Sequence, residues 1–408
     1  MRNATDKPRF RRRLSVWWTT LVTAVALCLV GAEGAVAQVA GTPHRLGYSY
    51  AQFQRDLQAI TATGVTGVLG EVTLAGHRMI GAHGVADIVT RRPVNPYGYF
   101  RIGSTTKTLV SVVLLQLAEE GRISLEDSVE EWLPGMVSGN GYDGAAITIR
   151  HLLQHTSGIH NYTETEQMTD QLGSVEGYYR TRFNSVTPEE LVALGLSEPP
   201  DFPPGTGWHY SNTNFVLAGL IIERVTGRSW SQEVRTRILQ PLGMRHTFDP
   251  GTRPGLPHPH ARGYQQFTED GPLVDTTLGN YSWAHAAGAL ISTAGDLGRF
   301  WRALERGELL GPVGMAQLHD TVLADDPELQ QVMPGARYGL GIIWQPFSCG
   351  GGYWEHGGDT LGYATVTGVS EDGRHSVVLS LSTQLISFDA HLAAMRLVDR
   401  ALCAAQRR

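Results

Sequence analysis

Strand-like patterns occur at both ends of the chain and helical patterns lie between them, which restricts the folds that it can form. Near the N-terminus, apolar residues alternate with small or polar ones over residues 64–87. Similar stretches return near the C-terminus at 338–344, 362–370 and 375–382. The region between, about 123–283, shows helical periodicity and proline turns. Since strands must pair to bury their apolar faces, we expect one sheet built from both ends of the chain.

This arrangement predicts an α+β domain in two parts. Residues 38–122 and 284–408 would form the part that contains the sheet, and residues 123–283 would form an inserted, mainly helical part of the same domain. Apolar residues recur at helical spacing in segments 51–61, 104–120, 149–155, 187–194, 214–226, 230–238 and 389–405.

The first 37 residues have the features of a secretory signal peptide. Arg9–Arg13 is a basic stretch, residues 16–30 are apolar, and Ala35–Ala37 fits a small-residue cleavage site before Gln38. A retained membrane anchor is the alternative, because the apolar run has intermediate length. We expect cleavage, and therefore a secreted, extracytoplasmic protein with no stable membrane span.

The composition argues against one class of partner. The chain has 33 basic and 39 acidic residues, a formal net charge of −6. Because phosphate binding requires a basic face, this balance argues against nucleic acid as a partner. A hydrophobic content of 42% and a charged content of 18% are typical of a globular protein with a large core. We expect a monomer.

Almost every basic residue is an arginine, and the two exceptions are Lys7 and Lys107. Lys107 lies three residues after Ser104, at the start of the predicted helix 104–120. Residues three apart share a helix face, so the hydroxyl and the amine should be neighbours. Arginine stays protonated, whereas a desolvated lysine can lose its proton and activate a serine nucleophile. We therefore predict that Ser104 and Lys107 are catalytic, although serine and lysine at this spacing also occur at solvated helix starts.

A second motif is Tyr210-Ser211-Asn212. A tyrosine with a depressed pKa can act as a general base, and an asparagine amide can hold a lysine or a substrate carbonyl. The alternative is a loop in which Asn212 caps the following helix. A third motif is His356-Gly357-Gly358 after a predicted strand, where glycines let a substrate approach the strand edge and histidine adds a donor. Its alternative is a strand that ends in a glycine turn.

These three motifs, in this order, resemble the penicillin-recognising serine hydrolases. That family includes class C β-lactamases, D-alanyl-D-alanine carboxypeptidases and related esterases. The resemblance extends over about residues 45–405 and is closest to a secreted actinobacterial D-alanyl-D-alanine carboxypeptidase. Further matching stretches are 151–158, 210–219, Trp283 with 286–292, and 338–341.

The resemblance implies a β-lactamase/transpeptidase-like fold and a mechanism. Ser104 would attack a carbonyl and become acylated, while Lys107 and Tyr210 exchange protons, and either could be the base. The backbone N–H groups of Ser104 and Asp359 would form the oxyanion hole. No metal or organic cofactor is implied. The residues expected to bind or position the substrate are Asn212, Trp283, His356, Gly357, Gly358 and Asp359.

Two other groups of residues allow alternatives. Cys349 and Cys403 are an even pair in an exported chain and predict a disulfide, whose positions also match the resemblance. Two free buried thiols are the alternative. His151 and His155 have the spacing of metal ligands on a helix, but no glutamate follows His151 as zinc protease chemistry requires, so we expect no metal site.

The chain departs from the carboxypeptidase pattern where the substrate's terminal carboxylate would bind. Ile343 aligns with an arginine, and Gly357 and Asp359 align with threonines. The site has thus lost a cation and two donors and gained a carboxylate, which favours an ester, an amide or an amine-bearing substrate over strict carboxypeptidase activity. We expect a serine hydrolase acting on D-alanyl peptides, β-lactams, esters or D-amino-acid amides. The alternative is a protein that binds β-lactams or peptidoglycan fragments without turnover.

Overall fold

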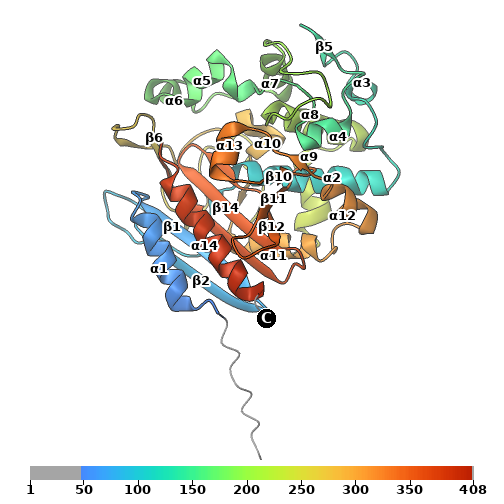
Figure 1. Ribbon diagram of the computed structural model, residues 1–408. Coiled ribbons are helices and arrows are strands. Elements are labelled where there is room, and N and C mark those ends of the chain that lie inside the picture. The colour runs from blue at the N-terminus through green and yellow to red at the C-terminus, as the bar shows by residue number, and fades with distance from the viewer. Residues whose placement is uncertain (1–46, 407–408) are drawn as a thin grey trace, which may run out of the picture. The chain divides into compact units, whose positions relative to one another are not determined.

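The computed structural model describes residues 47–406 (Figure 1). The predicted signal peptide, residues 1–37, lies outside the described residues. Among the residues that the structure describes, no helix combines the length and the apolarity that a membrane crossing requires.

A nine-stranded antiparallel sheet joins the two ends of the chain. Its strands are β1 (Gly67–Leu74), β2 (His77–Gly84), β9 (Val322–Leu323), β10 (Arg337–Tyr338), β11 (Ile343–Pro346), β12 (Gly352–Glu355), β13 (Gly358–Thr360), β14 (Tyr363–Ser370) and β15 (His375–Leu381). Their order is β2-β1-β15-β14-β12-β11-β10-β9, with β13 paired to β14. N-terminal β1 therefore pairs with C-terminal β15, which confirms the predicted α+β fold.

Helices cover both faces of this sheet. The helices α1 (Tyr50–Thr61) and α14 (Asp389–Gln406) lie over one face (Figure 1), where their apolar side chains form a cluster with Val377. The helix α11 (Ala294–Glu305) packs on the other face, in a cluster that contains Val378. Because successive residues of a strand point to opposite faces, β15 is buried on both sides.

The helix α2 (Thr106–Glu119) is almost wholly buried and contacts α8 (Asn212–Thr226), α10 (His285–Gly288) and α12 (Pro312–Leu318). A separate 3₁₀ turn, η1 (Gly103–Thr105), precedes it. The predicted division at 123 and 283 stays a prediction. The remaining elements are α3 (Val129–Trp132), α4 (Ile149–Gln154), η2 (Tyr162–Glu164), α5 (Glu166–Leu172), α6 (Val175–Thr181), α7 (Pro188–Gly195), α9 (Trp230–Val234), the π-helical turn η3 (Arg235–Leu239), η4 (Ser282–Ala284), α13 (Pro327–Val332), β3 (Phe100–Arg101), β4 (Ser138–Gly139), β5 (Tyr142–Asp143), β6 (Tyr264–Gln266), β7 (Leu273–Asp275), β8 (Ile291–Ser292) and β16 (Thr383–Gln384).

The predicted strand at 338–344 is instead a hairpin of β10 and β11. Its turn packs against α2, and Gly341 has a φ of +76° at a point where a β-carbon would lie 2.1 Å from the Ser111 hydroxyl oxygen. The apolar side chains of Leu340 and Ile342 are buried in this turn. The alternating pattern of apolar residues at 338–344 therefore did not distinguish a strand from a turn whose apolar side chains are buried in the core.

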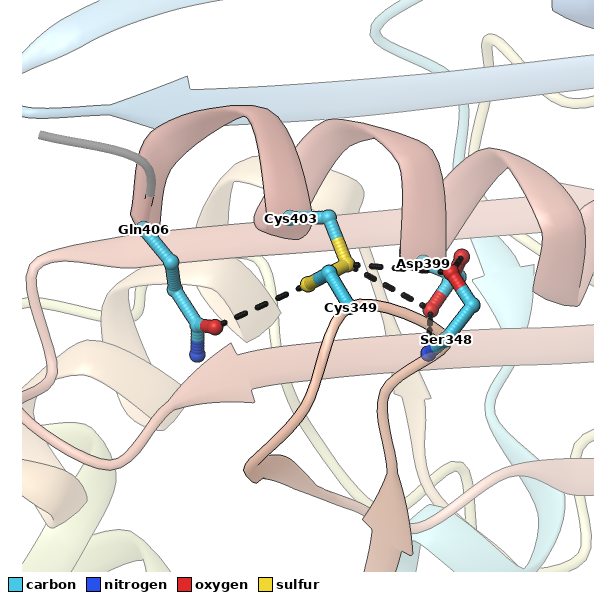
Figure 2. The surroundings of a disulfide bond; sticks show 5 residues. All are labelled: Ser348, Cys349, Asp399, Cys403 and Gln406. Atoms are coloured by element: carbon cyan, nitrogen blue, oxygen red, sulfur yellow. Dashed lines mark hydrogen bonds between the residues drawn. A yellow bond between two sulfur atoms is a disulfide. The ribbon is translucent and has the colours of Figure 1, made fainter.

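Cys349 and Cys403 form a disulfide that links the segment after β11 to α14 (Figure 2). Their Cα atoms are 6.0 Å apart, and they are separated by 54 residues in the sequence. The same segment is also held by Ser348, whose backbone N–H and hydroxyl donate to the Asp399 carboxylate at 2.8 and 2.5 Å (Figure 2). The predicted pairing is thus present in the structure.

We predict that replacing both Cys349 and Cys403 by serine lowers the free energy of unfolding by about 4 kcal/mol, because the bond closes a long loop in the unfolded chain. Urea unfolding of the oxidised protein and the double variant measures this difference. Ser348→Ala is the control, since it keeps the covalent link and should cost about 1 kcal/mol. A double variant as stable as the parent would contradict the prediction.

Candidate active site

The backbone around Ser104 is in close contact with β13. A β-carbon on Gly358 would lie 2.0 Å from the Ile102 carbonyl oxygen and 2.7 Å from the Ser104 nitrogen. A β-carbon on Gly103, whose φ is +50°, would lie 2.8 Å from the Asp359 nitrogen. Only glycine lets the two backbones approach this closely. The backbone segments that carry the nitrogens of Ser104 and Asp359 are therefore in direct contact, which suits an oxyanion hole formed by these two N–H groups.

Lys107 is fully buried and directs its amine at three acceptors. Its Nζ donates to Ser104 Oγ at 2.9 Å, to Asn212 Oδ1 at 2.7 Å and to the Ala287 carbonyl at 2.8 Å. Among the described residues, its hydrogen-bond partners include no carboxylate. Burial therefore lowers the pKa of Lys107 well below its usual value. An amine in this state can accept the proton of Ser104.

Tyr210 lies beside this pair, with its ring centroid 4.8 Å from Lys107 Nζ. Burial raises the pKa of Tyr210, and a side-chain hydrogen bond with Ser104 opposes that effect. This direction is opposite to the depressed pKa that a tyrosinate base requires. The protonated phenol is suited to give a proton.

Asn212 has a fixed amide orientation. Its Oδ1 accepts from Lys107, and its Nδ2 donates to Asn161 Oδ1 and Thr163 Oγ1, both at 3.2 Å. The helix α8 begins at Asn212 itself, and Ser211 occupies the N-cap position. The alternative role of Asn212 as a helix cap is therefore not observed.

His356 is 3% exposed, and its ring nitrogens are both occupied within the protein. Nε2 lies 2.9 Å from Tyr338 Oη, and Nδ1 lies 2.7 Å from the Gly357 carbonyl. The backbone carbonyl of His356 accepts from the Thr105 hydroxyl at 2.9 Å, which connects it to the residue after Ser104. Burial lowers the pKa of His356 to about 3.

Trp283 and Asp359 lie at two different cavities. Trp283 is half-buried, accepts a hydrogen bond on its carbonyl from Tyr162 Oη at 2.6 Å, and lines a cavity of about 30 Å³. Asp359 is exposed, accepts a hydrogen bond from Gln384 Nε2, and lines a cavity of about 320 Å³. A larger cavity of about 770 Å³ is lined by residues between 231 and 253 and by Leu290, and it contains none of the predicted site residues.

Residues outside the three motifs complete the surroundings of the site. His155 and Tyr338 lie in the matching stretches 151–158 and 338–341, so the sequence contained a signal for them, although not for their contact with His356. Asn161 had no such signal. The two histidines that have the spacing of metal ligands form hydrogen bonds within the protein. His151 Nδ1 accepts from the Thr148 N–H at 3.2 Å, and His155 Nε2 lies 3.1 Å from Tyr338 Oη.

Comparison with known proteins identifies relatives along most of the chain. The family model described as Beta-lactamase matches residues 34–401. The solved structure of a D-stereospecific amidohydrolase from Streptomyces sp. is 40% identical with a TM-score of 0.79, covering 85% of this chain and 98% of that one. A D-amino acid amidase from Ochrobactrum anthropi SV3 is 27% identical with a TM-score of 0.74, covering 87% and 99%.

Among curated proteins, Penicillin-binding protein 4* of Bacillus subtilis (strain 168) is 28% identical over 297 residues. That match covers 69% of this chain but only 60% of the relative. The chain thus spans well under two thirds of the length of this relative, whereas it spans nearly all of the two solved structures.

We predict that Lys107→Arg keeps the fold and slows the reaction of Ser104 with a fluorophosphonate by about a hundredfold or more, since a guanidinium cannot accept the proton. In the parent protein, this rate should rise as the pH increases through the pKa of Lys107, because the neutral amine is the active form. Burial places this rise well below the usual pKa of a lysine. The rate is measured by quenching the fluorophosphonate reaction at several times and quantifying the adduct by mass spectrometry, with Ser104→Ala as the blank. A parental rate in Lys107→Arg would refute the role of the amine.

Proposed function

The chain belongs to the beta-lactamase family of serine hydrolases, and we propose that it hydrolyses amides and esters of D-amino acids through an acyl-enzyme on Ser104. The observation that carries this choice of substrate is a cavity lined by three carboxylates, by apolar side chains and by His391. One of the carboxylates is Asp359 of β13, whose backbone contacts the Ser104 turn at Gly103. The mechanism follows from the contacts of Lys107, Tyr210 and the two backbone nitrogens.

Acylation begins with neutral Lys107, whose Nζ is 2.9 Å from Ser104 Oγ. Lys107 takes the hydroxyl proton while Oγ bonds to the substrate carbonyl carbon. The carbonyl oxygen becomes an oxyanion, which the N–H groups of Ser104 and Asp359 stabilise. We assign the base role to Lys107 because its pKa is lowered, whereas that of Tyr210 is raised.

Release of the leaving group requires a proton donor, and Tyr210 is suited to that role. As the bond from the carbonyl carbon to the leaving nitrogen or oxygen breaks, the phenol gives its proton to the leaving group and recovers one from the Lys107 ammonium. The acyl group is then on Ser104. A water molecule then attacks the ester carbonyl carbon, and its proton passes to Lys107. The bond from this carbon to Ser104 Oγ breaks, Oγ takes the proton back from Lys107, and the carboxylic acid product leaves, which restores the starting state.

The cavity next to Asp359 supports an amine-bearing, apolar substrate. Its volume of about 320 Å³ is at the lower end of small-molecule sites. Among the described residues, no arginine or lysine lines it. Its carboxylates come from Asp326, Glu328 and Asp359, and its apolar walls come from Leu329, Val332, Met333, Ala364, Leu381, Leu385, Phe388 and Ala390. A cationic ammonium is favoured beside these carboxylates, and a second carboxylate is not.

The environment of Ile343 agrees with this preference. Ile343 is buried in an apolar cluster with Ala324, Met333 and Tyr338, against which Tyr210 packs. A substrate that ends in a carboxylate would find no cation at this position. Similarity to a D-stereospecific amidohydrolase and to a D-amino acid amidase supports the choice of D-amino-acid derivatives.

A D-alanyl-D-alanine carboxypeptidase is the second candidate, favoured by the similarity to a penicillin-binding protein. A protein that binds β-lactams without turnover is a third. Each makes a distinct prediction in one substrate panel of D-phenylalanine amide, a D-Ala-D-Ala peptide, a p-nitrophenyl ester and nitrocefin. Turnover of the peptide above that of the amide would favour the carboxypeptidase, and adducts without turnover would favour the binding protein.

We propose further that the protein acts outside the cytoplasm. The leader-like residues 1–37 and the disulfide of Cys349 and Cys403 support this proposal, since such bonds persist in oxidising compartments. Intact mass spectrometry of the protein from culture medium should give a chain that starts at Gln38. A chain that stays with the membrane and keeps the leader would contradict export.

We predict that Asp359→Asn lowers kcat/KM for D-phenylalanine amide by about ten- to hundredfold, because a charged hydrogen bond to the substrate ammonium is lost. The N-acetylated amide, which has no ammonium, should be a poor substrate for the parent and should change little in the variant. Steady-state kinetics with both substrates measures the difference.

Asp325→Asn is the matched control, since Asp325 is exposed nearby but does not line the cavity. It should leave both rates unchanged. Equal losses for the free and the acetylated amide in Asp359→Asn would contradict amine recognition by this carboxylate, whereas hydrolysis of neither substrate by the parent would reject the substrate class itself.

A further inference from the structure

The buried side chains of His155, Tyr338 and His356 form a continuous line of hydrogen bonds. None of them belongs to the proposed proton-transfer groups Ser104, Lys107 and Tyr210. His155 Nε2 lies 3.1 Å from Tyr338 Oη, and Tyr338 Oη lies 2.9 Å from His356 Nε2. All three side chains are almost wholly buried, with exposures of 0%, 0% and 3%. The line thus joins the C-cap residue of α4, the strand β10 and the residue that follows β12.

The protons in this line can be placed from its two ends. At one end, His155 Nδ1 faces two donors, the Ser211 backbone N–H and Asn214 Nδ2, both at 3.2 Å. The Ser211 backbone N–H can only donate, and Asn214 contributes Nδ2 when its Oδ1 accepts from Ser157 Oγ at 2.6 Å. Nδ1 of His155 must therefore be an acceptor, and the ring proton is on Nε2.

At the other end, His356 Nδ1 faces the Gly357 carbonyl oxygen at 2.7 Å. A carbonyl is only an acceptor, so Nδ1 carries the proton and Nε2 is the acceptor. The two ends require the same direction in the middle: His155 donates to Tyr338 Oη, and Tyr338 donates to His356 Nε2. No other assignment of neutral rings satisfies both ends.

Burial keeps the line in this single state. It lowers the pKa of His155 well below its usual value and that of His356 to about 3, and it raises the pKa of Tyr338. All three groups are therefore neutral, and none changes charge near neutral pH.

Each end of the line is attached to a different part of the proposed machinery. At the first end, the ring of His155 holds the Ser211 N–H, between Tyr210 and Asn212, and lies against the Tyr210 ring with centroids 4.3 Å apart. At the second end, the His356 carbonyl accepts from the Thr105 hydroxyl, and the chain continues directly into β13, which carries the Asp359 nitrogen.

We propose that Tyr338 is a positioning residue that, through this directed hydrogen-bond line with His155 and His356, sets the proton-transfer groups at the correct distance from the oxyanion donors. This role rests on the proposed function, and Tyr338 itself does not touch the reacting atoms. Removal of its hydroxyl would leave the donor His155 Nε2 and the acceptor His356 Nε2 buried and unpaired. The proton-transfer groups and the oxyanion donors would then no longer be held at a fixed distance from each other.

Tyr338→Phe should lower kcat by about ten- to hundredfold, while KM stays within about threefold, because the substrate cavity next to Asp359 is retained. Tyr353→Phe is the matched control. Tyr353 is also a buried tyrosine of the sheet, but it packs against Phe347 in the cluster on the other face and has no place in the line. The control should keep the parental kcat.

A direct readout is the tautomer of each histidine in protein labelled with ¹⁵N-histidine, with the signals assigned from His155→Asn and His356→Asn. In the parent, His155 should be protonated at Nε2 and His356 at Nδ1, and neither should titrate between about pH 5 and pH 9. In Tyr338→Phe, the ¹⁵N shift of His356 Nε2 should move, because that nitrogen loses its donor. Tyr353→Phe should leave it in place.

Two outcomes would overturn the proposal: an Nε2-protonated His356 in the parent, or a parental kcat in Tyr338→Phe. The tautomer measurement needs no substrate. If Ser104 failed to react with any substrate or fluorophosphonate, the proposed function would fall, while the tautomers would still report on the line itself.

Discussion

The buried amine of Lys107 is the contact on which the rest of the site depends. It joins the Ser104 turn, the start of α8 through Asn212, and the Ala287 carbonyl of α10. These segments are brought together by packing around α2, and the same packing removes water from the amine. Because no carboxylate is among its described partners, burial lowers the pKa of the amine and favours loss of its proton. In the proposed mechanism, the packing that assembles the core therefore also prepares Lys107 to activate the serine.

A second constraint is the close approach of η1 and β13. Gly103 and Gly358 allow the backbones of η1 and β13 to touch next to the nitrogens of Ser104 and Asp359. The buried line through His155, Tyr338 and His356 supports the same region from behind. Backbone donors on a sheet edge need such support, because a shift of a fraction of an ångström changes how they meet a developing oxyanion.

Charge separates this site from one that recognises a terminal carboxylate. The buried side chains His155 and His356 are neutral, and Ile343 lies in an apolar cluster. Asp359, in contrast, is exposed and lines a cavity together with the carboxylates of Asp326 and Glu328. The proposed mechanism therefore keeps the acyl-enzyme chemistry on Ser104, while the charges that line the proposed substrate cavity are opposite to those that would bind a carboxylate. The proposed preference for amine-bearing substrates follows from this inversion.

The sequence by itself determined what depends on neighbouring residues and on periodicity. Ser104 and Lys107 could be paired because a three-residue spacing predicted their proximity, although Ser104 lies in the 3₁₀ turn η1 and only Lys107 lies in α2. Alternation at both ends of the chain predicted one shared sheet. The turn within 338–344 was missed, because an apolar turn covered by the core has the same pattern as a strand. Only the tertiary structure decided the partners of Lys107, which are 105 and 180 residues away, and the contact of Tyr338 with His356. It also decided the direction of the Tyr210 pKa, since that direction depends on burial, which no local pattern specifies.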